Sequence, residues 1–173
     1  MTSTGAHRRL LVEGGFANDN PTWSPDGKSI AFARHESATT WQIYSIGFGG
    51  HGLRQLTSRP GQNVTPSWAP DGRRIAFSRQ NQGGLWQIYV MNADGTGARS
   101  VGDGKGSDSA PRWAPDESAL AFVREVGLNG SRVYVLTLGT RRVRAISPPS
   151  LDAVEPSWAP RGPLVAFAAR ERN

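Results

Sequence analysis

The chain has 173 residues, a length that suits one domain, and carries a formal net charge of +6 at pH 7. It contains no cysteine, which excludes disulfides, a thiol nucleophile and cysteine-based metal sites. No segment is apolar enough to span a membrane, and the first 20 residues lack the apolar run of a signal peptide. We expect one domain over residues 1–173, with a flexible tail over 1–6.

An internal repeat dominates the sequence. Four tryptophans follow one another at intervals of 45 residues, at Trp23, Trp68, Trp113 and Trp158. Each follows one proline by two positions and precedes another by two. Periods of about 40 to 45 residues are typical of four-stranded propeller blades. The sequence therefore predicts an all-β propeller of four repeats.

Each repeat contains four short candidate strands in the same order. The first strand ends at the tryptophan, and the other three are rich in β-branched and aromatic residues, as strands are. The expected second strands cover 30–32, 75–77, 120–122 and 165–167. The expected third strands cover 41–44, 86–89 and 132–135, and the fourth cover 54–57, 99–101 and 144–147.

The turns and prolines orient the strands within a blade. The segment 24–27 reads Ser-Pro-Asp-Gly, which favours a type I turn, whereas the third repeat has Glu117 in place of the glycine. Proline cannot donate a ladder hydrogen bond, so the Pro-x-Trp strand is expected at the edge that lines the central channel. The fourth strand is then the outer edge, and its arginines protect that edge from aggregation.

The fourth repeat is incomplete, which leaves two arrangements open. The chain begins with a candidate fourth-type strand over 7–12 and stops after the second strand of the last repeat. The N-terminal strand can complete the last blade and close a four-bladed ring. Alternatively the arc stays open and its end faces are covered by other sequence or by a second copy, giving a homodimer.

These residues resemble the repeat of TolB-type β-propellers. That repeat reads roughly Pro-x-Trp-Ser-Pro-Asp-Gly-x-x-Ile-Ala-Phe, then Ile-Tyr, then Arg-x-Leu-Thr, and the first repeat matches it from Trp23 to Thr57. The resemblance implies a binding or scaffold module, or a propeller that accompanies a prolyl-oligopeptidase-like hydrolase. It also implies a place in the cell envelope or periplasm, whereas the missing signal peptide predicts the cytoplasm if the chain is complete.

Residues that could carry chemistry are few. The three histidines have no metal-ligand spacing, and no nucleophile elbow is present, so we expect neither an enzyme nor a cofactor. The segment 47–52 has the letters of a dinucleotide fingerprint but lies in a predicted turn without a helix after it. Trp41 and Trp86 are candidates for glycan binding if exposed, although burial between blades is the competing interpretation.

One column of polar residues suggests a binding surface. Asn18, Asn63 and Asp108 share a position in their repeats, in loops expected at the channel mouth. The competing interpretation is that these side chains bond their own backbone and close the loops. We expect a protein or peptide partner, cationic or amide-rich, rather than nucleic acid. The candidate ligand-binding residues are Asn18, Asp19, Asn20, Asn63, Asp108, Arg112, Asp152 and Glu155. Replacing Asn63 and Asp108 is expected to leave folding nearly intact.

Overall fold

The computed structural model describes residues 9–13, 17–127 and 130–172. In these ranges the regular secondary structure is entirely β, as the repeat predicts. The strands of the first two repeats are β1 (Asn18–Trp23), β2 (Ser29–Ser37), β3 (Thr40–Gly47), β4 (Arg54–Gln55), β5 (Asn63–Trp68), β6 (Arg74–Gln80), β7 (Trp86–Asn92) and β8 (Arg99–Ser100). The others are β9 (Asp108–Trp113), β10 (Ala119–Val126), β11 (Gly130–Thr137), β12 (Arg142–Ala145), β13 (Leu151–Trp158) and β14 (Val165–Glu171).

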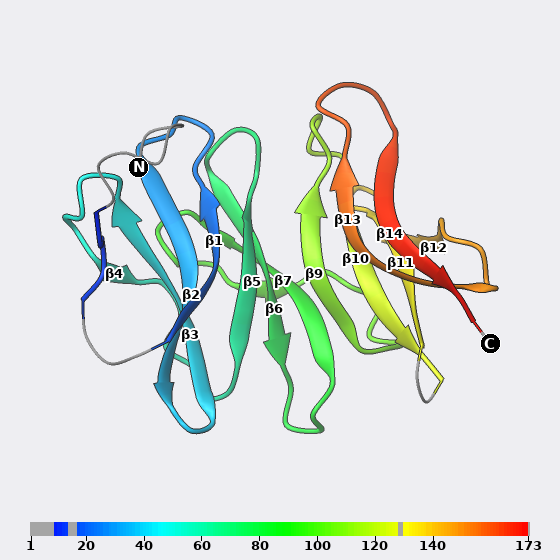
Figure 1. Cartoon of the computed structure of the whole chain (residues 1–173), viewed down its shortest axis with the longest axis horizontal. Coiled ribbons are helices and arrows are strands. Elements are labelled where there is room, and N and C mark those ends of the chain that lie inside the picture. The colour runs from blue at the N-terminus through cyan, green and yellow to red at the C-terminus, as the bar shows by residue number, and fades with distance from the viewer. Residues whose placement is uncertain (1–8, 14–16, 128–129, 173) are drawn as a thin grey trace.

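The strands form one antiparallel sheet per repeat. Three sheets have four strands in chain order, from β1 to β4, β5 to β8 and β9 to β12, and the last sheet has only β13 and β14. The sheets stand side by side along the long axis of the molecule (Figure 1). The first strands of neighbouring sheets contact one another, from β1 through β5 and β9 to β13. They therefore form the inner edge of the arc, and the arginine-bearing strands β4, β8 and β12 form the outer edge, as predicted.

The turn after the inner strand holds its expected shape in the first three blades, even where the sequence departs from the pattern. Gly27 and Gly72 have φ angles of 68° and 70°, and their amides bond back to the first residue of the turn. Glu117 takes the equivalent place with φ 60°, a region that favours glycine. Its carboxylate forms an ion pair with Arg74 and accepts a bond from the Asp71 amide at 2.7 Å. These contacts to the preceding blade compensate the strained backbone.

The hydrophobic core lies between the sheets. One cluster joins the first and second blades around Ile43 and Phe77, and another joins the second and third around Ile88 and Phe122. A smaller cluster joins the third blade to the last sheet. Since each cluster draws residues from two neighbouring sheets, the blades stabilise one another by stacking, as repeat proteins do.

The repeated tryptophans belong to these interfaces. Trp113 is buried, and its indole N–H donates to the carbonyl of Ser67 in the preceding blade at 3.1 Å. Trp158 donates to the Arg112 carbonyl in the same way at 3.0 Å. Trp68 packs on the first interface, but its buried indole nitrogen has no hydrogen-bond partner among the described residues. Trp23 is the first of the series, no preceding blade lies against it among the described residues, and it is 58% exposed.

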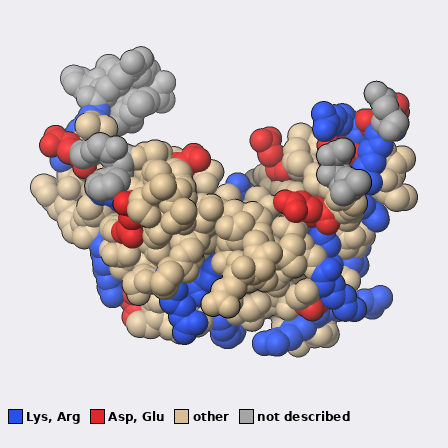
Figure 2. Space-filling view, turned by 90° about the horizontal axis from the view of Figure 1, so that it is seen from below, with Lys and Arg blue, Asp and Glu red and all other residues tan. Residues whose placement is uncertain are grey.

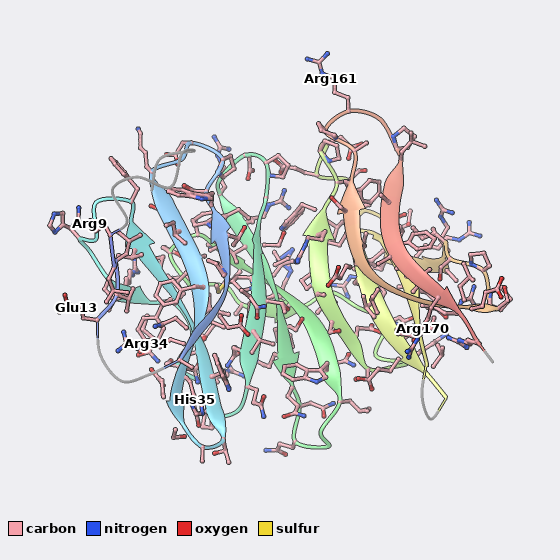
Figure 3. All side chains as sticks on the ribbon, in the orientation of Figure 1. Arg9, Glu13, Arg34, His35, Arg161 and Arg170 are labelled. Carbon is pink, nitrogen blue, oxygen red and sulfur yellow. The ribbon has the colours of Figure 1, made fainter. Side chains whose placement is uncertain are left out.

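The N-terminal segment does not close the ring. The prediction of a strand over 7–12 is wrong for residues 9–12, which form no strand; residues 7 and 8 and the predicted tail over 1–6 lie outside the described residues. Leu10, Leu11 and Val12 instead line an apolar groove on the first blade with Ile30 and other residues. The arginine at position 9 lies beside this blade, whereas Arg170 of β14 lies at the opposite end of the molecule (Figure 3). In the part of the chain that the structure describes, the arc is open.

Candidate functional site

The column of Asn18, Asn63 and Asp108 opens the inner strands, directly across the sheet from a column of arginines. The register pairs Asn18 with Arg34, Asn63 with Arg79 and Asp108 with Arg124. In the last sheet both positions are alanine, at Ala153 and Ala169. The last sheet thus lacks both the amide or carboxylate and the arginine opposite it. Because the two are lost together, we infer that they form a structural pair in which the amide or carboxylate binds the arginine.

Asn63 is fully buried and joins two blades. Its Oδ1 accepts a bond from Arg79 Nε at 2.7 Å, and its Nδ2 donates to the Gln42 side chain at 3.0 Å. Gln42 in turn accepts a bond from the Thr57 hydroxyl at 2.6 Å. Arg79 lies over the ring of Tyr89, 4.5 Å from its centre. The polar atoms of Asn63 are thus used inside the protein.

Asp108 is also fully buried, and it binds Arg124 through both oxygens. The distances are 2.6 Å to Nε and 2.7 Å to Nη2. Burial raises the pKa of Asp108, and the bonds from Arg124 act against that rise. The same bonds raise the pKa of Arg124 above its ordinary value, and Asp103 adds to this effect from the preceding loop. Asn63 and Asp108 are therefore not at the loop surface, and in place of nearly intact folding we expect that replacing them destabilises the chain.

Asp152 anchors the last sheet to the third blade. Its Oδ1 accepts bonds from the Ser131 amide and hydroxyl, both at 2.7 Å, and its Oδ2 pairs with Arg170 Nε at 2.9 Å. The bonds from Ser131 lower the pKa of Asp152 below its ordinary value, and Arg170 adds to that lowering. This carboxylate is also committed to contacts within the chain.

The inner strands share an irregularity that sequence reasoning missed. One residue at the same position of every inner strand has a left-handed backbone: Asn20, Thr65, Ala110 and Glu155, with φ between 51° and 53°. The ladder to the second strand shifts at this point in each sheet, which is the pattern of a β-bulge. The proline that follows each of these residues was the available signal, since it cannot donate to the ladder.

The bulges bring a second set of predicted residues to the surface. Asp19, Asn20, Arg112 and Glu155 are exposed on the inner strands. Asn20 and Arg112 line one cavity of about 270 Å³ together with Thr22, Ser67 and two prolines. Surrounding protein lowers the pKa of Arg112 while the Glu155 carboxylate opposes that shift, so opposite charges lie near each other on β9 and β13.

Acidic and basic side chains are unevenly distributed over the surface of the molecule. Figure 2 shows a hollow between two lobes with Asp and Glu on its sides; Lys and Arg lie along the lower edge of that view and also on the right-hand lobe. The exposed arginines of the outer strands, Arg54, Arg99, Arg142 and Arg144, belong to the outer edge of the sheets. The inner edge thus offers acidic and amide groups together with the guanidinium of Arg112, and the outer edge offers basic groups.

The other candidates take structural places. Trp41 is half-buried and stacks on His35, with ring centres 4.8 Å apart, and Trp86 is also half-buried. The segment 47–52 forms the connection from β3 to β4, and no helix follows it. Among the described residues no three His, Asp or Glu side chains gather as a metal site. The same residues include no helix with the length and apolar character needed to cross a membrane.

A family model for the TolB beta propeller domain matches residues 2–173, so the chain belongs to this family. No curated protein sequence matches it. Among solved structures, TolB from Agrobacterium tumefaciens has a TM-score of 0.81 and 21% identity, over 92% of this chain and 58% of that one. TolB from Acinetobacter baumannii has a TM-score of 0.79 and 22% identity, over 98% and 44%. This chain therefore spans about half the length of these TolB structures.

A peptidase has a similar fold. The puromycin-hydrolyzing peptidase of Mycobacterium tuberculosis has a TM-score of 0.64 and 20% identity, over 80% of this chain and 24% of that one. At such identities the likeness shows the propeller fold alone. The family model confirms the TolB-type resemblance, and the function is left to be argued from the residues of the inner edge.

Proposed function

We propose that the chain is a non-enzymatic propeller module that binds an extended protein or peptide segment along its inner edge. The row of left-handed bulges carries this proposal. A non-glycine residue with positive φ costs on the order of 1–3 kcal/mol and persists where the surrounding structure imposes it, often at functional sites. Here the strained residue recurs at the same repeat position in all four inner strands. This recurrence favours a surface that continues from blade to blade over strain caused by the packing of a single blade.

The charge of the inner edge selects the chemistry of the ligand. Asp19, Asn20 and Glu155 present carboxylate and amide oxygens, and Arg112 presents a guanidinium beside them. Carboxylates attract lysine or arginine side chains, and the amide and guanidinium can bond the backbone carbonyls of an extended segment. A peptide rich in amide side chains with isolated cationic residues fits this surface better than nucleic acid, whose phosphates the carboxylates repel.

A labelled peptide tests the proposal. The probe is a fluorescein-labelled 12-residue peptide of Gln, Asn and Ser with two central lysines, measured by fluorescence anisotropy at low salt. The variant with Asp19→Asn and Glu155→Gln should bind about fivefold more weakly, since each exposed charge contributes ~0.2–1 kcal/mol. The matched control, Arg142→Gln with Arg144→Gln on the outer edge, should bind as the unmodified chain does. No binding by the unmodified chain, or a loss caused by the arginine variant alone, would refute inner-edge binding.

A second candidate is a propeller that accompanies a hydrolase. Its support is the similar fold in the puromycin-hydrolyzing peptidase. On this hypothesis the catalytic residues belong to another domain. The purified chain should then hydrolyse neither p-nitrophenyl esters nor aminoacyl-p-nitroanilides. Turnover that disappears with a single polar-to-alanine change in this chain would contradict both candidates.

A further inference from the structure

An open cavity of about 530 Å³ lies between the turns of the first two blades. Pro25 and Asp26 line it from the turn after β1, and Pro70 and Asp71 line it from the turn after β5. Trp68, the repeated tryptophan of the second blade, forms part of its wall. Both blades that enclose the cavity are complete four-stranded sheets.

The next interface shows what fills the equivalent space between the second and third blades. Arg74 extends over the ring of Trp113, with its guanidinium carbon 4.7 Å from the ring centre, and forms an ion pair with Glu117. Two attractions hold this guanidinium, one to the face of the aromatic ring and one to the carboxylate. A tryptophan and a carboxylate at this place in the repeat therefore form a site for a guanidinium group.

The cavity is the counterpart of this arginine site, one repeat earlier. Counted back by 45 residues, the three residues that form the contact become Ser29, Trp68 and Gly72. All three line the cavity. The tryptophan is retained, whereas Ser29 and Gly72 are too short to fill the space that the arginine and the glutamate fill at the next interface. The first interface thus offers the ring without a guanidinium of its own.

The charge of the cavity suits a cation. The carboxylates of Asp26 and Asp71 line it, and both residues are exposed. The Ser24 hydroxyl donates to Asp26 at 2.6 Å, and this bond lowers the pKa of Asp26, with a further lowering by the Lys28 amide. Asp26 is therefore charged at neutral pH. Lys28 itself is not among the described residues that line the cavity.

The third interface has a different chemistry. Its residue in the place of Asp71 is Arg161, which extends outward from the loop between β13 and β14 (Figure 3). Ala119 takes the place of Ser29 and is buried in a cluster against which Trp158 packs. Among the three interfaces between described blades, two carboxylates and an unfilled space beside the tryptophan therefore occur together only at the first.

We propose that the cavity between the first two blades binds a guanidinium group, stacked on Trp68 and paired with Asp26 and Asp71. The group belongs either to a free small molecule or to an arginine side chain of a polypeptide, since both present the same planar cation. A guanidinium fits better than an ammonium because it stacks on aromatic rings and is more weakly hydrated. None of these residues is an inner-edge candidate, and neither proposal depends on the other.

Two probes test the site and distinguish the sources of the group. Methylguanidinium and the end-blocked peptide Gly-Gly-Arg-Gly-Gly are titrated at low salt into the isotope-labelled chain. Heteronuclear NMR follows the backbone amides of 24–29 and 68–72 and the indole signal of Trp68. Both probes should shift these signals saturably, and Gly-Gly-Lys-Gly-Gly should bind about threefold more weakly than its arginine counterpart. A peptide that binds more than about tenfold more tightly than methylguanidinium assigns the site to a polypeptide, and equal affinities assign it to the free group.

Ser29→Arg is the decisive variant, because it supplies a tethered guanidinium at the repeat position of Arg74. It should weaken the binding of both probes at least about tenfold, since a tethered group competes at high effective concentration. Ser29→Ala keeps the cavity open and should bind as the unmodified chain does. Asp26→Asn with Asp71→Asn keeps the oxygens that the turns use and should weaken binding about fivefold. Asp116→Asn, at the same turn position of the third blade, is the matched control and should change nothing.

The outcomes separate this site from the inner edge. Asp19→Asn with Glu155→Gln should leave the binding of methylguanidinium unchanged. Binding that survives both Ser29→Arg and the double asparagine variant, equal binding of the lysine peptide, or no shift with either guanidinium probe would overturn the proposal. If Ser29→Arg fails to fold, the double asparagine variant decides: undiminished binding by that variant overturns the site.

Discussion

Replacing Trp113 tests whether the blades stabilise one another through the repeated tryptophans. Trp113 is 6% exposed, packs in the cluster between the second and third blades, and donates to Ser67 across the interface. Trp113→Ala should lower the free energy of unfolding by about 3–5 kcal/mol, the usual cost of such a truncation in a core. Trp113→Phe keeps most of the apolar contact and loses the hydrogen bond, which costs about 0.5–1.5 kcal/mol, with a further cost if the Ser67 carbonyl stays unpaired.

Trp23 is the matched control because it occupies the same position of the repeat, and among the described residues no preceding blade packs against it. Its side chain is largely exposed, so Trp23→Ala should cost less than ~1 kcal/mol, as surface changes do. Urea titrations of the three variants give the differences from the midpoints if the slope with denaturant stays unchanged. Equal losses at Trp23 and Trp113, or a loss below ~1 kcal/mol for Trp113→Ala, would refute stabilisation by blade stacking at this site.

Three further changes probe other parts of the fold. Asp108→Ala leaves Arg124 buried without its main partner and should cost about 3–5 kcal/mol in urea titration, whereas exposed Asp19→Ala should cost under ~0.5 kcal/mol. Asp152→Asn should destabilise the chain at pH 7. Because the folded pKa of Asp152 is lowered, the stabilising effect of this carboxylate is present above the unfolded pKa of about 4 and disappears as the pH falls through the folded pKa. Below the folded pKa, the variant and the unmodified chain should unfold alike. Gly95→Ala should lower the melting temperature more than Gly27→Ala, because both have positive φ but an added Cβ at Gly95 would lie 2.6 Å from the Leu56 carbonyl oxygen and at Gly27 would meet nothing within 4 Å.

The period of the sequence was enough to predict the sheets. Each strand order, the inner place of the proline strands and the burial of Trp113 follow from a repeat in which turn residues and apolar residues return in phase. The strand over 7–12 was predicted only from its place in the 45-residue repeat. The place of a residue in the repeat does not tell which face of a blade is left uncovered by a neighbouring blade. The N-terminal segment covers the apolar face of the first blade instead.

The exposure of the candidate residues could be predicted only in part, because a shared position in the repeat does not tell whether a side chain points outward. Asn63 and Asp108 were placed at the channel mouth, yet both pair with an arginine 16 residues later in the chain. The arginine column was visible in the sequence at the same period. Its loss together with the amide column, at Ala153 and Ala169, was the signal for internal pairing.

Hydrogen exchange with the two-lysine peptide tests inner-edge binding most directly. The exchange of backbone amides is compared with and without saturating peptide, strand by strand. Binding along the inner edge predicts slower exchange at β1, β5, β9 and β13, centred on the bulges at Asn20, Thr65, Ala110 and Glu155. Slower exchange confined to the outer strands β4, β8 and β12 would contradict it and make the basic rim the binding surface.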